Sequence, residues 1–147
     1  MDVERLIGEE SASWDRLLEV FASIPDDRFE EPTVTPEGWS PKDVMFHVAY
    51  WTADCADVLK RIAAGTWDGG ADETTGTIEA SNRDGFQRST AMSPAEVRTG
   101  FAERRAHMLG AFRALDEVTP GAWEWFEESG PLHYAKHVDD LAAWLGR

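Results

Sequence analysis

Two histidines stand one helical turn apart in the segment His133-Tyr134-Ala135-Lys136-His137, near the C-terminal end of the chain. On a helix, residues i and i+4 share one face about 5 to 6 Å apart, so both imidazole rings can reach one ion. A third histidine, His47, lies in an earlier amphipathic segment and is the natural third ligand. Three neutral imidazoles suit zinc, nickel, copper or iron, and they leave a position open for water or substrate.

A structural role is the alternative for each of these histidines. A spacing of four residues also arises by chance in a chain that has four histidines. A single histidine such as His47 is more often a hydrogen-bonded core residue than a metal ligand. The fourth, His107, projects off the apolar stripe of its segment, and we expect it at the surface.

Helical periodicity runs through most of the chain and predicts the elements that must position these residues. Four long helices are expected, over residues 3–24, 40–64, 93–115 and 131–145, with a shorter helix over residues 78–87. The second and third begin with a serine N-cap, a proline in the first helical position and an acidic residue three positions after the serine. The pattern therefore predicts an all-α fold, with the histidines at the seam between helices.

Length and composition limit the function classes. The 147 residues fit one domain, 1–147, and the single Cys55 excludes an internal disulfide. The N-terminal segment lacks a basic and apolar signal, so a soluble, cytoplasmic protein is expected, with no membrane partner. A net charge of −14 disfavours nucleic acid as a partner. A small-molecule substrate is expected, and a homodimer is left open.

Five further residues are candidates for supporting roles. Asp140, Asp54 or Glu10 would orient imidazole N–H groups around a bound metal. Arg104 falls on an apolar stripe and would hold a substrate carboxylate. Trp51 would line the pocket, although aromatic residues at helical spacing are more often part of the core. No residue is assigned as a catalytic nucleophile.

Two segments carry a family resemblance. GWSPKDVMFHVAYW at residues 38–51, together with HYAKHVDDL at residues 133–141, resembles the DinB-like (YfiT-type) superfamily of metalloenzymes. The resemblance implies an up-down-down-up four-helix bundle, with a short extra helix in this chain. It also implies metal ligands at one histidine early in the second helix and at a His-x-x-x-His in the last, which correspond to His47, His133 and His137.

The same resemblance implies a chemistry. Functional members of the family depend on thiols such as mycothiol or bacillithiol, as maleylpyruvate isomerases or S-transferases, and a related group detoxifies electrophilic natural products. A metal-dependent S-transferase or related detoxification enzyme is therefore expected. Zinc or nickel would be its metal, and a low-molecular-weight thiol its cosubstrate. The alternative is a non-enzymatic protein on the same bundle that binds or sequesters a small molecule or a metal in a stress response.

Overall fold

Helices make up nearly all of the regular structure. The computed structural model describes residues 2–69 and 75–146, and no strand occurs within those ranges. The helices are α1 (Val3–Ala22), α2 (Pro41–Ala63), α3 (Thr75–Thr90), α4 (Pro94–Arg113), α5 (Pro120–Ser129) and α6 (Pro131–Trp144), with a short 3-10 helix, η1, at Asp26–Arg28. The predicted all-α class is confirmed.

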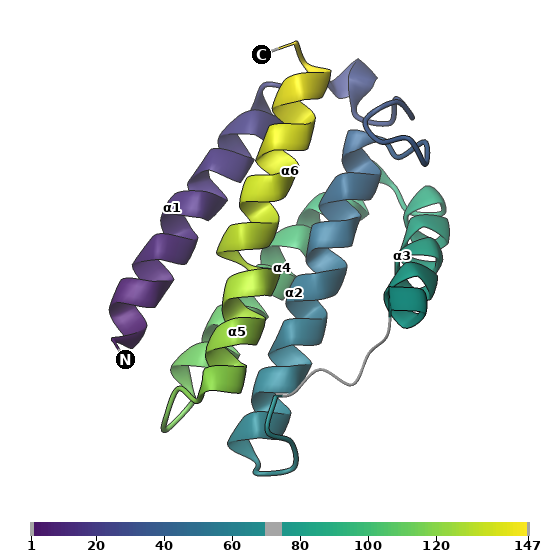
Figure 1. The fold of residues 1–147 in the computed structure, drawn as a ribbon. Helices are drawn as coiled ribbons and strands as arrows, with labels where there is room; N and C mark the ends of the chain where they lie inside the picture. The colour runs from purple at the N-terminus through teal and green to yellow at the C-terminus, as the bar shows by residue number, and fades with distance from the viewer. Residues whose placement is uncertain (1, 70–74, 147) are drawn as a thin grey trace.

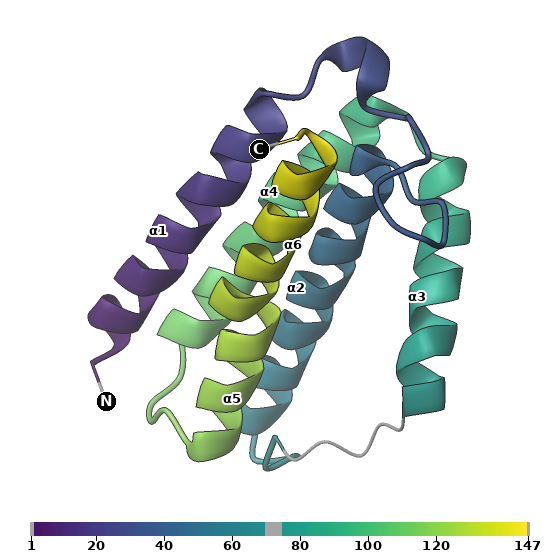
Figure 2. The same ribbon diagram turned by 45° about the horizontal axis from the view of Figure 1, so that its top comes forward.

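Four positions of a bundle are held by α1, α2, α4 and the pair α5–α6, while α3 lies outside them, beside α2 (Figure 1 and Figure 2). In Figure 1, α1 runs up, α2 and α4 run down, and α5 and α6 run up again. This is the expected up-down-down-up order. The extra helix is α3, which spans residues 75–90 rather than the predicted 78–87.

The helix starts follow from short local motifs. The Ser40 hydroxyl accepts a hydrogen bond from the backbone N–H of Asp43, and the Asp43 carboxylate accepts one from the N–H of Ser40. Ser93 and Glu96 form the same reciprocal pair at the start of α4. Both motifs satisfy N–H groups that a helix end leaves without a partner, so α2 and α4 begin where the sequence predicts.

Apolar stripes on the helices meet in one core. On α2, Val44, Val48 and Cys55 are buried in the core, and α2 packs most extensively against α4. Trp14 of α1 stacks on Phe101 of α4, with ring centroids 4.3 Å apart. Burial of these side chains holds α2 and α4 together independently of the histidines.

One helix in the bundle, α5, does not follow from the sequence pattern. It ends at Gly130, whose φ and ψ of −104° and −105° are not helical, and Pro131 begins α6. A Cβ at Gly130 would lie only 2.8 Å from the carbonyl oxygen of Phe126, so a side chain does not fit there. The break divides the fourth bundle position in two, so that α5 packs on α2 while α6 packs on α1.

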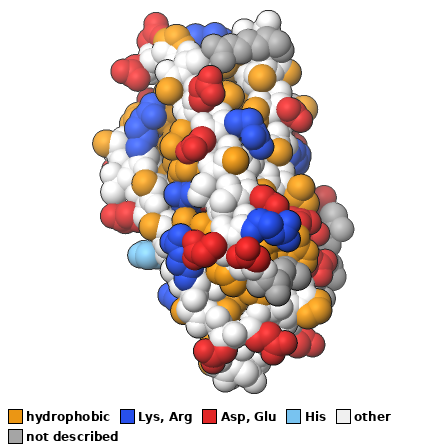
Figure 3. All heavy atoms as spheres, turned by 90° about the vertical axis from the view of Figure 1, so that its left-hand side faces the viewer, with side chains coloured by type: hydrophobic (Ala, Val, Ile, Leu, Met, Phe, Trp, Pro, Cys, Tyr) orange, Lys and Arg blue, Asp and Glu red, His pale blue; other side chains and the backbone are white. Residues whose placement is uncertain are grey.

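Opposite charges are interspersed on the face over α1 (Figure 3). Arg5 pairs with Glu9 along the helix, and Arg113 of α4 pairs with Glu4. These pairs are exposed and contribute little to stability individually. The charged side chains on this face are thus a solvated surface of mixed sign.

A buried hydrogen bond joins α3 to α2. The hydroxyl of Ser89 donates to Oδ1 of Asp43 at 2.6 Å, while Oδ2 of the same carboxylate caps α2. Ser89 is fully buried and Asp43 nearly so. This bond positions α3 over one side of the histidines.

We expect Ser89→Ala to lower the free energy of unfolding by about 1.5 to 3 kcal/mol, because it removes a buried hydrogen bond to a charged group. Urea denaturation followed by circular dichroism measures the change. Thr90→Ala is the matched control, since Thr90 is exposed and bonds only to the carbonyl of Gln87 in its own helix. Equal effects at the two positions would contradict the role of the bond in docking α3.

Candidate metal centre

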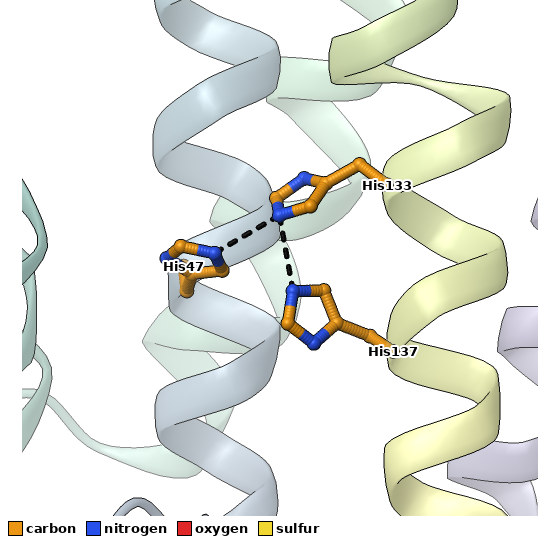
Figure 4. A group of neighbouring side chains, drawn as sticks. All are labelled: His47, His133 and His137. Carbon is orange, nitrogen blue, oxygen red and sulfur yellow. Dashed lines mark hydrogen bonds between the residues drawn. The ribbon is translucent and has the colours of Figure 1, made fainter. Parts of the chain in front are cut away.

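Three histidine side chains meet between α2 and α6 (Figure 4). His47 projects from α2, and His133 and His137 project from successive turns of α6. Nε2 of His133 lies 2.9 Å from Nε2 of His47 and 3.0 Å from Nε2 of His137. One ring nitrogen from each residue lies within 4.8 Å of the other two. The tertiary structure therefore brings together the three histidines that the spacing singles out.

Hydrogen bonding among the rings cannot satisfy these contacts. A neutral imidazole nitrogen carries either one hydrogen or one lone pair, so Nε2 of His133 can bond well to only one of its two neighbours. Nitrogens about 2.0–2.1 Å from one zinc ion lie about 3.3 Å apart, so small side-chain shifts would let all three converge on an ion. The donor set fits a divalent metal better than it fits a closed hydrogen-bond network.

Burial keeps all three imidazoles neutral. Burial, together with the two neighbouring histidines, lowers the pKa of His47 to about 2. It lowers the pKa of His133 to about 3 and that of His137 to about 4. The positive charge of Lys136 acts in the same direction on each ring. Because neutral imidazole is the form that binds metal, the ligands are available at neutral pH.

The metal-free protein is expected to lose stability as the pH falls below 6.5. The folded-state pKa values lie below the ordinary value, so the unfolded chain binds protons that the folded chain excludes. Stability is full above pH 6.5 and falls toward acid by about 1.4 kcal/mol per pH unit for each histidine involved.

Urea denaturation of the chelated protein at pH 7.5, 6.0 and 5.0 measures this slope. His47→Gln should reduce the slope, because the variant lacks one of the three excluded protons. The exposed His107 provides the control, and His107→Gln should retain the slope. A slope that is the same in wild type and in His47→Gln would show that the buried histidines do not cause it.

Two groups lie beside the outer nitrogens of the α6 rings. Oδ2 of Asp140 is 3.2 Å from Nδ1 of His137, although the pair lacks good hydrogen-bond geometry. The backbone of Ser129 raises the pKa of His133, against the effect of burial, although Nδ1 of His133 makes no hydrogen bond of good geometry. Carboxylates and carbonyls in such positions orient ligand imidazoles and select their tautomer. Asp140 is therefore close enough to His137 that its predicted role in orienting that imidazole stays a prediction.

A groove of about 330 Å³ opens on one side of the histidines. Its walls include Trp51 of α2 and Trp125 of α5, and it reaches His47 and His133. The indole N–H of Trp51 donates to Oδ1 of Asn82 on α3, at 3.0 Å. Trp51 thus lines the pocket as expected from the sequence. We call this space the first groove.

The second groove, of about 740 Å³, opens on the other side, where Trp39 and Phe86 form part of its wall. It reaches His47 and His137. Asn82 and Lys136 line both grooves, as does His47. A bound metal would therefore be accessible from two directions, at a junction formed by these shared residues.

Glu10 is placed differently from its expected role. It is fully buried, and both carboxylate oxygens accept hydrogen bonds from Arg105, at 2.9 and 2.6 Å. Oε2 also accepts from the hydroxyl of Tyr134, at 2.9 Å. The expectation that Glu10 orients an imidazole is wrong, because its oxygens are committed to these partners. The sequence analysis did not predict Arg105 and Tyr134 as hydrogen-bond partners of Glu10.

Arg104 also lies apart from the histidines. It lines a shallow groove on α4, next to Gly100 and Glu103, that shares no residue with the two grooves beside the histidines. The expectation that it holds a substrate carboxylate is therefore wrong. Asp54 lines neither of those grooves. His107 is exposed, as predicted.

Fold and site together define a class: a helical bundle whose central histidines could hold a metal ion at the junction of two grooves. A family model for the DinB superfamily matches residues 11–145, and the chain belongs to that superfamily. Searches of curated proteins and of solved structures returned no match. Within residues 2–69 and 75–146, no helix combines the length and apolar character needed to cross a bilayer.

Proposed function

We propose that this protein is a metal-dependent enzyme that transfers a low-molecular-weight thiol to small electrophilic molecules. His47, His133 and His137 hold the metal, for which zinc and nickel are the best matches to an all-imidazole site. The observation that carries the proposal is the convergence of three neutral imidazoles, one buried and two partly buried, where two grooves meet. A divalent ion held by these histidines would lower the pKa of a bound thiol or water and so would supply a nucleophile near neutral pH.

The chain's own thiol is unsuited to that chemistry. Cys55 is the single cysteine, it is fully buried, and burial raises the pKa of its thiol to about 12. A thiolate is the reactive form, so Cys55 stays inert at neutral pH. The reacting sulfur then comes from a cosubstrate that enters one of the two grooves.

The surrounding residues have separate tasks in this proposal. Asp140 orients His137 so that its Nε2 lone pair faces the metal, and the Ser129 carbonyl does the same for His133. Trp51 and Trp125 provide apolar walls that exclude water from one side of the reacting centre. The two grooves admit thiol and electrophile from opposite sides of the metal.

The test begins with protein purified without a histidine tag. Elemental analysis should find about one zinc or nickel per chain. The protein is then assayed with 1-chloro-2,4-dinitrobenzene and a panel of mycothiol, bacillithiol and cysteine, with thioether formation as the readout. Turnover should require both a thiol and the metal, and chelation should remove it. Full activity after chelation would overturn the proposal, and one metal per chain without turnover would favour the non-enzymatic binding protein instead.

A further inference from the structure

The junction of the two grooves carries a free positive charge. Lys136 follows His133 by one turn of α6, is exposed, and lines both grooves. Among the described residues, no carboxylate lies within ion-pair distance of its ammonium group. Lys42, in contrast, is buried and paired with Glu30. Lys136 therefore has its charge available for a ligand.

A second donor lies at the same junction. The indole N–H of Trp51 can only donate, so the oxygen of the Asn82 amide must face it. The two N–H groups of that amide then lie on the opposite side of the Asn82 side chain. Asn82 lines both grooves, as Lys136 does, so an ammonium group and an oriented amide donor flank the same space beside the histidines.

We infer that Lys136 and Asn82 form a carboxylate-binding subsite, so that the electrophilic substrate is a small apolar molecule bearing a carboxylate group. This inference rests on the proposed function for the role of the metal, but the subsite itself uses no metal ligand. The ammonium group pairs with the carboxylate and the Asn82 amide donates to it. The apolar part of the molecule lies against Trp51 and Trp125.

The surrounding charges favour a carboxylate over a phosphate. Glu124 and Glu128 line the first groove, where Lys136 is the one lysine or arginine among the described lining residues. Glu37, Glu79 and Asp140 line the second groove, together with Arg83. One ammonium group balances one negative charge, whereas a phosphate dianion would bring a second charge toward these carboxylates. The long-range influence of Lys136 on all three histidines is consistent with its position at the junction.

The test compares an acid with its neutral amide. Binding of 1-naphthylacetate and 1-naphthylacetamide is measured by calorimetry, with the metal-loaded protein and again after chelation. The acid should bind at least about tenfold more tightly than the amide in both forms, because a charge-assisted bond contributes about 1.4 kcal/mol or more. Preference in the chelated protein distinguishes the subsite from direct coordination of the carboxylate by metal.

Two variants test which residues cause the preference for the acid over the amide. Lys136→Met should make the two probes bind equally, and Asn82→Leu should reduce the preference. Lys60→Met is the matched control, since Lys60 is an exposed lysine in the last turn of α2 and lines neither groove. Equal binding of acid and amide by the wild-type protein, or a preference that survives Lys136→Met, would overturn the inference. An equal loss of the preference for the acid in Lys60→Met would also overturn it. Failure to bind metal, with the preference intact, would overturn only the proposed enzyme activity.

Discussion

His133→Ala is expected to abolish stoichiometric metal binding, with a loss of affinity of at least about 100-fold for zinc or nickel. His133 is the central member of the cluster, because its Nε2 lies within 3.0 Å of the Nε2 atoms of both His47 and His137. Its removal leaves only two imidazole ligands, which are not enough to hold the ion against a free chelator. Competitive titration with a metallochromic indicator measures the affinity.

The same variant should keep its helices. Buried apolar side chains hold α2 against α4 and α1 against α6, and His133 is not part of that core. Far-ultraviolet circular dichroism of His133→Ala should therefore match wild type. His107→Ala, at an exposed position on α4, is the control and should bind metal normally. Loss of the fold in His133→Ala, or full metal binding by it, would refute the assignment of His133 as a ligand.

Arg105→Ala is expected to lower the free energy of unfolding by about 3 to 5 kcal/mol, because it leaves the buried charge of Glu10 without its cation. Arg105 donates to both oxygens of Glu10, and its guanidinium group also lies 4.9 Å from the ring centroid of Trp14. The fully buried Glu10 would keep only the hydroxyl of Tyr134 as a partner. Urea denaturation at pH 7.5 measures the change.

The preceding residue supplies the control for that experiment. Arg104 is only partly buried and lines a separate surface groove, so Arg104→Ala should change stability by less than about 1 kcal/mol. In the double variant Glu10→Leu with Arg105→Leu, both charges are removed together, and much of the lost stability should return. A small effect of Arg105→Ala, or an equal effect of Arg104→Ala, would contradict the buried ion pair.

Local interactions decide where most helices begin, so the starts of these helices can be predicted from the sequence. Ser40 and Ser93 each cap a helix through bonds to a residue three positions later, and these bonds form within one turn of chain. The i, i+4 spacing of His133 and His137 likewise requires only that the segment be helical. His47 is the natural third ligand because it lies in an amphipathic segment, and the family resemblance, confirmed by the match over residues 11–145, adds the helix order.

Periodicity could not identify α5. The segment 120–129 is short and rich in aromatic side chains, and it has no long apolar stripe that would indicate a helix. The break at Gly130 is itself local, because its N–H donates to the carbonyl of Phe126 one turn earlier, at 2.9 Å, and that carbonyl leaves no room for a Cβ. Its consequence is that α5 brings Trp125 to the first groove while α6 carries the histidines.

The partner of Glu10 and the surroundings of the histidines were decided by tertiary structure alone. Neighbouring residues on a helix point about 100° apart, so the rotation of α4 in the bundle determines that Arg105, and not Arg104, reaches Glu10. Lys136 and Asn82 meet at the histidines because α3 packs beside α2, where the Ser89–Asp43 and Trp51–Asn82 hydrogen bonds join the two helices. The sequence by itself determined the long helices, through apolar periodicity and caps that form within a turn, and it singled out His47, His133 and His137 as candidate ligands. Packing between helices decided what surrounds those ligands, because contacts distant along the chain depend on how each helix is rotated in the bundle.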